Sequence, residues 1–178
     1  ADPSARAVWR WRTAVQNEFQ ARMDWCVTPK AKANHPPAIL GPSEQAAGPT
    51  HVVARPGGSI RLSAGEIRDP DGDTIACRWF VYPEAGTYAG RVSLHDDEGE
   101  TTTVNVPADL GDRTIHLLLA ATDSGAPPLT RYRRLILSAL LTPQAEPLAD
   151  EFVKAGMRKV SVRASTDDPQ WSSVTLTR

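Results

Sequence analysis

The sequence predicts a mainly β protein: an antiparallel β-sandwich with an N-terminal helix and a C-terminal helix-plus-hairpin extension. Two observations carry this prediction. Short segments rich in β-branched and aromatic residues recur through the middle of the chain, and clusters of turn-forming residues separate them. Fifteen prolines and twelve glycines among 178 residues also suit a loop-rich β protein better than a helical one.

The clearest strand lies within residues 69–90. The turn-forming sequence Asp-Pro-Asp-Gly-Asp occupies 69–73, and a run of β-branched and aromatic residues follows at 75–82. Alternate residues of a strand share a face, and one face here is uniformly apolar: Ile75, Cys77, Trp79 and Val81. We therefore expect that face to pack against a core.

Further strands are expected on both sides of this stretch, at 51–53, 59–64, 91–94, 102–107, 114–122 and 131–141, with the sandwich beginning near 36–39. The segment 114–122 is apolar on both faces apart from His116, which predicts a central strand. About seven strands at this spacing fit a sandwich.

Residues 5–27 are predicted to form a helix, with Ser4 as its N-cap. Its apolar stripe has three- and four-residue steps: Val8, Trp11, Val15 and Phe19. Trp9 and Trp25 fall outside this stripe, so the helix has more apolar surface than packing along one face can bury. We expect a partner interface that includes Trp9, Trp11, Phe19 and Trp25.

The chain is expected to divide into four regions. A junction helix occupies 1–28, a proline-rich connector 29–50, the β-sandwich 51–142 and an extension 143–178. Within the extension we expect a short helix over 147–156, followed by two strands that pair as a hairpin, at 158–163 and 173–177.

Charge and hydropathy exclude two classes of partner. The formal net charge of -1 argues against a nucleic-acid or anionic-membrane surface, which needs a basic excess. No apolar run approaches the ~20 residues of a membrane-spanning helix. Cys26 and Cys77 leave two alternatives open: a disulfide, which requires an oxidising compartment, or two separate buried thiols.

A calcium site is one candidate on this chain. Asp69, Asp71 and Asp73 alternate in a turn, and Asp123 lies in a second turn that can reach the same end of a sandwich. Calcium needs several oxygen ligands, which alternating aspartates can supply. The alternative is that the aspartates hydrogen-bond their own backbone, as turn aspartates do. No other cofactor is indicated.

A sugar-binding site is a second candidate. Sugars bind to exposed aromatic rings with planar polar groups beside them. The candidate rings are Tyr82 and Tyr88, with Glu84 and Arg78 as polar companions, and Trp171 and the helix tryptophans as further rings. The alternative for the two tyrosines is ordinary packing at a strand edge, with the hydroxyl group exposed to solvent.

A catalytic site is not indicated by any motif. The four histidines stand alone, outside metal-binding spacings, and neither a nucleophile elbow nor a phosphate loop occurs. His116, inside an apolar strand, suits a core or interface position better than a catalytic base. We therefore do not expect this chain alone to be an enzyme.

Several stretches together resemble one known family: WRWRTAVQNEFQARMDWCV (9–27), ANHPP (33–37), DPDGD (69–73), FVYPEAGTYAG (80–90) and TDSGAPPLTRYRR (122–134). That family is the C-terminal domain of secreted cellulose-binding proteins whose N-terminal domain is nucleoside-hydrolase-like. The resemblance covers roughly residues 5–138. Shorter stretches of the sequence also look like PKD and immunoglobulin-like modules and like cadherin repeats.

The resemblance implies an immunoglobulin/PKD-like, extracellular domain attached to a larger α/β domain, with 5–27 at the junction. This sequence has Glu18 where the family pattern suggests Asp, which puts a shared carboxylate role in doubt. The favoured hypothesis is a non-catalytic accessory module that binds polysaccharide. The alternatives are one part of a nucleoside-hydrolase-like glycosidic-bond hydrolase, whose catalytic domain lies outside this chain, and a structural interaction module.

Overall fold

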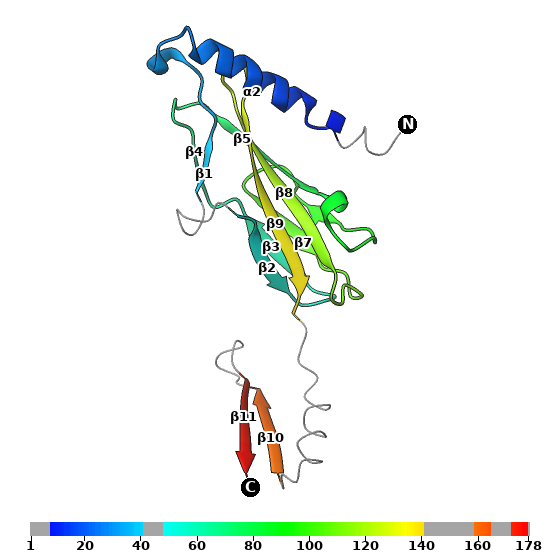
Figure 1. Cartoon of the computed structure of the whole chain (residues 1–178). Coiled ribbons are helices and arrows are strands. Elements are labelled where there is room, and N and C mark those ends of the chain that lie inside the picture. The colour runs from blue at the N-terminus through cyan, green and yellow to red at the C-terminus, as the bar shows by residue number, and fades with distance from the viewer. Residues whose placement is uncertain (1–7, 41–47, 141–158, 165–171, 178) are drawn as a thin grey trace. The chain divides into compact units, whose positions relative to one another are not determined.

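The computed structural model describes residues 8–40, 48–140, 159–164 and 172–177 (Figure 1). The chain forms two compact units, 1–140 and 141–178. In the second unit, β10 (Lys159–Ala164) and β11 (Ser172–Thr177) pair as the predicted antiparallel hairpin. The expected helix over 147–156 and Trp171 lie outside the described residues.

The larger sheet of the first unit has four strands in the order β2 (Thr50–Ala54), β9 (Thr130–Ala139), β8 (Thr114–Asp123) and β5 (Ile75–Val81). Three of these strands pair antiparallel, but β2 runs parallel to β9. The prediction of a purely antiparallel sandwich was therefore wrong at this edge. A parallel pair needs a long connection, and here most of the domain lies between the two strands in sequence.

A second sheet contains β3 (Ser59–Ser63), β7 (Thr101–Asn105) and β6 (Leu94–His95). A separate antiparallel pair joins β1 (Ala38–Leu40) to β4 (Glu66–Arg68). The strand β4 was not predicted, because three residues carry too little pattern to identify a strand.

One hydrophobic core lies between the two sheets. Trp79 is 1% exposed, and the predicted inner face of β5 contacts this core through Cys77 and Val81 as well. The other sheet contributes Leu62 and Val104. The mainly β fold class is thus confirmed, with both sheets contributing to one core.

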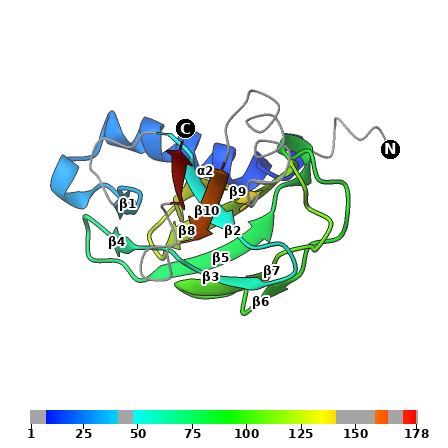
Figure 2. The same cartoon turned by 90° about the horizontal axis from the view of Figure 1, so that it is seen from below.

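The helix α2 (Arg12–Trp25) lies on the outer face of the four-stranded sheet, opposite the second sheet, as Figure 2 shows from below. Two short 3-10 helices accompany it, η1 (Lys30–Lys32) and η2 (Pro83–Ala85). Part of the predicted helix 5–27 is confirmed by α2, while Ser4 lies outside the described residues. No helix in the described part of the chain is long and apolar enough to cross a membrane.

Candidate functional site on the N-terminal helix

The inner face of α2 is anchored where Trp11 meets the sheet. The Trp11 ring lies 5.9 Å from Tyr82, 6.1 Å from Phe80 and 5.0 Å from Tyr132, measured between ring centroids. Phe80 and Tyr82 point away from the core, on the outer side of β5 and of the residue that follows it. The start of the helix therefore packs on outward-facing aromatic side chains next to β5 and on β9. Edge-to-face pairs of this kind add to the free energy of simple burial.

Polar contacts fix the middle of the helix. Arg131 Nη1 donates to Glu18 Oε2 at 2.9 Å, and Arg22 Nη2 donates to the other carboxylate oxygen at 2.9 Å. Asn17 Nδ2 donates to the carbonyl oxygen of Pro128 at 2.8 Å. The hydrogen bond from Arg131 lowers the pKa of Glu18, against the opposing effect of burial. Glu18 therefore has an internal role in this chain, as the ion pair that ties α2 to β9.

The C-terminal end of α2 is held by Trp25. Its Nε1 donates to the carbonyl oxygen of Asn34 at 2.8 Å, and its ring stacks on His35 with centroids 5.7 Å apart. His35 continues the chain of contacts, because its backbone N–H donates to Asp71 Oδ2 at 2.6 Å. The helix, the segment after it and the aspartate turn are thus linked.

The outer face of α2 carries a second row of large apolar side chains, and these are exposed. Val15 is 63% exposed and Phe19 is 64% exposed. With Met23 and the exposed apolar residues that flank the helix in sequence, they form what we call the outer stripe: Val8, Trp9, Val15, Phe19, Met23 and Val27. Several large apolar side chains exposed along one helix and its ends mark an interaction site more often than a single exposed residue does.

The predicted single stripe of Val8, Trp11, Val15 and Phe19 is therefore divided between two faces. Only Trp11 packs on the sheet, because its ring fits among three aromatic rings, and the helix approaches closely further on at Ala21, which is 1% exposed. Of the expected partner-interface residues, Trp11 and Trp25 contact this chain itself, while Trp9 and Phe19 remain available.

Two members of the outer stripe were missed in the sequence, Met23 and Val27. The signal was present, since Val15, Phe19, Met23 and Val27 recur at steps of four residues. Near the other end of the stripe, the guanidinium of Arg12 lies over the Trp9 ring at 4.6 Å from its centroid. A cation beside an exposed aromatic ring keeps that ring in place at the surface.

The predicted sugar-binding residues are not brought together on one flat surface. Tyr82 contacts Trp11, and Glu84 accepts from Arg10 Nη2 at 2.9 Å, so both face the start of the helix. Tyr88 instead packs against the core, and its hydroxyl donates to Asp109 Oδ1 at 2.9 Å. That hydrogen bond raises the pKa of Tyr88. Arg78 is exposed on β5 and pairs by its backbone with Glu98.

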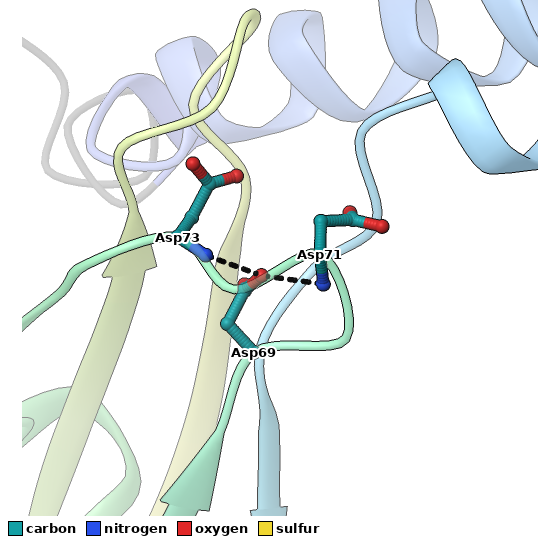
Figure 3. Close-up of side chains that lie close together, drawn as sticks. All are labelled: Asp69, Asp71 and Asp73. Atoms are coloured by element: carbon teal, nitrogen blue, oxygen red, sulfur yellow. Dashed lines mark hydrogen bonds between the residues drawn. The ribbon is translucent and has the colours of Figure 1, made fainter.

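The aspartate turn forms as a compact, hydrogen-bonded loop (Figure 3). Asp69 Oδ1 accepts from the backbone N–H of Asp71 at 2.9 Å and of Asp73 at 3.1 Å. One carboxylate oxygen from each of the three aspartates lies within 4.8 Å of the other two, which is close enough for all three to contact one cation. Asp123 stands outside this group, because its Oδ1 accepts from the backbone N–H groups of Gly125 and Leu129.

The two cysteines are free thiols, so the Cys26–Cys77 disulfide considered from the sequence is not formed. Cys26 is exposed just after α2, and its Sγ lies 3.3 Å from the carbonyl oxygen of Arg22. Cys77 is half-buried on the core face of β5, where burial raises the pKa of its thiol. The two side chains occupy different layers of the domain.

A small cavity of about 110 Å³ lies beside the end of α2 and is lined by Ala21, Asp24, Trp25, Thr28, Lys32, Ala33, Asn34, Ala126 and Pro127. Pockets that enclose a drug-sized ligand measure roughly 300–1,000 Å³. This cavity is therefore too small to be an enzyme's substrate cleft.

Residues 59–139 match the family model described as cellulose-binding protein Sde0182, C-terminal domain. The resemblance predicted from the sequence is therefore confirmed over these residues. No curated protein sequence matches the chain.

Among solved structures, the fold is similar to that of a nucleoside hydrolase-related hypothetical protein from Saccharophagus degradans that is associated with carbohydrate metabolism. The two sequences are 36% identical, and the TM-score is 0.69. The match covers 73% of this chain but only 32% of the other, so this chain spans about a third of that protein's length.

Two less similar structures are a PKD domain from the KIAA 1837 protein and cadherin domains of protocadherin gamma B2. The PKD domain is 22% identical with a TM-score of 0.35, covering 60% of this chain and 98% of that one. The protocadherin is 22% identical with a TM-score of 0.39, covering 60% of this chain and 26% of that one.

Proposed function

We propose that this chain is a non-catalytic accessory module of an extracellular, carbohydrate-associated protein, and that the outer stripe of α2 packs against a nucleoside-hydrolase-like domain. The observation that carries the proposal is the pair of apolar faces on one helix. The inner face is already covered, because Trp11 packs on aromatic rings of the sheet and Ala21 is buried. The outer stripe has no such cover among the described residues, and Val15 and Phe19 are both more than half exposed.

The choice of occupant is supported by the relative from Saccharophagus degradans. That protein is nucleoside hydrolase-related and about three times as long as the part matched here. A neighbouring domain that covers the outer stripe would remove several large apolar side chains from water, at roughly 25 cal/mol for each Å² buried. In this proposal the neighbouring domain cleaves glycosidic bonds, and the present chain supports it.

Sedimentation of mixtures tests the docking. The probe is the nucleoside hydrolase-related part of the Saccharophagus degradans protein, prepared without its own matching domain. We expect the wild-type chain to associate with it, and Val15→Glu with Phe19→Glu together to weaken the association at least tenfold, since two buried charges without partners are costly. The control is Glu66→Lys, which changes an exposed residue of β4 outside the outer stripe and should leave the association unchanged.

A second candidate function is binding of a polysaccharide. It is supported by the family description of residues 59–139 and by the exposed rings of Trp9 and Phe19. Depletion isotherms on insoluble cellulose, xylan and chitin test it with the full chain. Saturable binding that weakens in Trp9→Ala supports a binding module; an absence of binding to all three polymers removes this candidate for the isolated chain.

A further inference from the structure

A second surface, on the same sheet but away from α2, brings an arginine and two histidines together. His51 on β2 and His116 on β8 are both in register with Ile136 on β9, so the three side chains share the outer face. Arg134 lies two residues before Ile136 and therefore points to the same side. These three groups, His51, His116 and Arg134, form what we call the basic cluster.

The helix does not contact this part of the sheet. The described polar and aromatic contacts of α2 and the residues before it with the sheet and its loops are with residues at the other end: Phe80, Tyr82, Glu84, Pro128, Arg131 and Tyr132. Figure 1 shows α2 crossing one end of the sheet, while β2 and the last residues of β9 lie toward the other end. His51 and Arg134 are exposed, and beside them Val53 is 55% exposed.

The electrostatics of the cluster favour an anion. Arg134 forms no salt bridge with any described residue, whereas Arg131 on the same strand pairs with Glu18. His116 is 9% exposed, and its Nδ1 is buried without a hydrogen-bond partner, which leaves Nε2 as the nitrogen that can meet a ligand. Burial lowers the pKa of His116, and the nearby Arg134 and His51 lower it further. The unpaired guanidinium of Arg134 is therefore a positive charge beside two imidazole rings, and an anion would be attracted to it.

The shape of the surface favours a chain-like ligand. Tyr132, Arg134 and Ile136 alternate along β9 on the outer face, about 6.6 Å apart from one to the next. Tyr132 is 41% exposed despite its contact with Trp11. A planar guanidinium between an aromatic and an aliphatic side chain can bind a carboxylate with two hydrogen bonds, while the flanking side chains contact apolar C–H faces of sugar rings.

We propose that the basic cluster is an anion site that binds carboxylate groups of an acidic polysaccharide, such as a polymer of uronic acids. The proposal rests on the proposed carbohydrate association and deepens it, because it assigns a charge to the polymer. Arg134 and His51 are the contacting groups, and His116 lies beneath them as the inner donor.

The test compares a charged and a neutral polymer that share the cellulose backbone, and adds a polymer of uronic acid. Binding of the 178-residue chain is measured by affinity electrophoresis with soluble carboxymethyl cellulose, neutral hydroxyethyl cellulose and polygalacturonate. We expect the two anionic polymers to retard the chain and the neutral polymer to have no effect. Arg134→Gln should weaken the binding about tenfold, because a charge-assisted hydrogen bond is lost. The matched control Arg91→Gln removes an exposed arginine in the loop before β6 and should change the affinity less than twofold.

Two results would overturn this proposal. Equal weakening by Arg134→Gln and Arg91→Gln would mean that net charge, not the cluster, attracts the polymer. Equal affinity for polyglutamate would assign the cluster to acidic proteins instead of polysaccharides. Neither result touches the docking of the outer stripe, whose sedimentation test uses different residues, so the two proposals fail separately.

Discussion

The ring of Trp11 on the N-terminal segment meets Tyr132 on β9 edge to face, with centroids 5.0 Å apart and an interplanar angle of 84°. This contact joins two segments that are more than a hundred residues apart in sequence. Together with the Glu18–Arg131 ion pair it makes the helix part of the β domain. The docking proposal depends on this anchoring, because only a fixed helix presents a fixed outer stripe.

Replacing Trp11 by alanine should loosen the helix from the sheet. Large aromatic side chains removed from packed sites cost about 3–5 kcal/mol, and the only partial burial of Trp11 reduces this to about 2 kcal/mol. The matched control is Trp9→Ala, since Trp9 is 59% exposed and should contribute less than ~0.5 kcal/mol. Urea unfolding measures both, and similar losses for the two variants would show that Trp11 is not an anchor.

Replacing Glu18 by glutamine should lower the free energy of unfolding at neutral pH by about 1 kcal/mol, because the charged hydrogen bonds to Arg131 and Arg22 are weakened. The folded protein holds the pKa of Glu18 below its usual value, so this contribution is present above the usual pKa of a glutamate. It is lost as the pH falls through the lowered value.

The stability of Glu18→Gln should therefore converge with that of the wild type in acid. Glu66→Gln is the control, since Glu66 pairs with Arg68 in an exposed position. A deficit in Glu18→Gln that is unchanged at low pH would indicate that the amide disturbs packing and not charge.

His116 should make the domain less stable in acid. Its folded pKa lies below the ordinary value of a histidine, so the unfolded chain takes up a proton more readily than the folded one. The free energy of unfolding should fall as the pH decreases through the ordinary histidine pKa, and His116→Gln should flatten this part of the profile. His95→Gln serves as the comparison, because His95 is exposed. If both variants keep the wild-type slope, His116 is not the responsible group.

Calcium should raise the thermal midpoint only if the aspartate turn holds a cation. Asp69 Oδ1 already accepts two backbone N–H groups, and Asp71 lies 3.0 Å from the Nδ1 of His35, so most of the turn's contacts come from the chain itself, while Asp69 Oδ2 is buried without a hydrogen-bond partner. We expect less than ~1 °C between excess calcium and excess chelator, because a ligand without affinity for the native state cannot shift its stability. A larger, saturable rise that Asp71→Asn abolishes would make the turn a metal site.

Strand patterns predicted the β domain well, because burial repeats every two residues in the segments that form β5, β7 and β9. The face of α2 that packs could not be predicted in the same way. The helix carries apolar side chains on more than one face. Whether Trp11 or Phe19 is the buried ring depends on aromatic residues of strands that are distant in sequence.

The contact between the segment after α2 and the loop between β8 and β9 could not be predicted from the sequence either. The amide of Asn34 lies directly over Gly125, where a Cβ atom would overlap it, and its Nδ2 donates to the carbonyl oxygen of Pro127 at 2.8 Å. Such a contact links positions about ninety residues apart, and no local periodicity reports it. The basic cluster was missed for the same reason, since it depends on the parallel pairing of β2 with β9.

The docking of the outer stripe can be followed through the rate at which Cys26 is alkylated. This thiol is exposed beside Met23 and Val27 at the end of the outer stripe and needs no substitution to report on it. Adding a saturating amount of the nucleoside hydrolase-related part of the Saccharophagus degradans protein should slow the reaction of Cys26 with iodoacetamide at least tenfold, while the half-buried Cys77 keeps its rate. An unchanged rate at Cys26 would contradict the docking of α2 on such a domain.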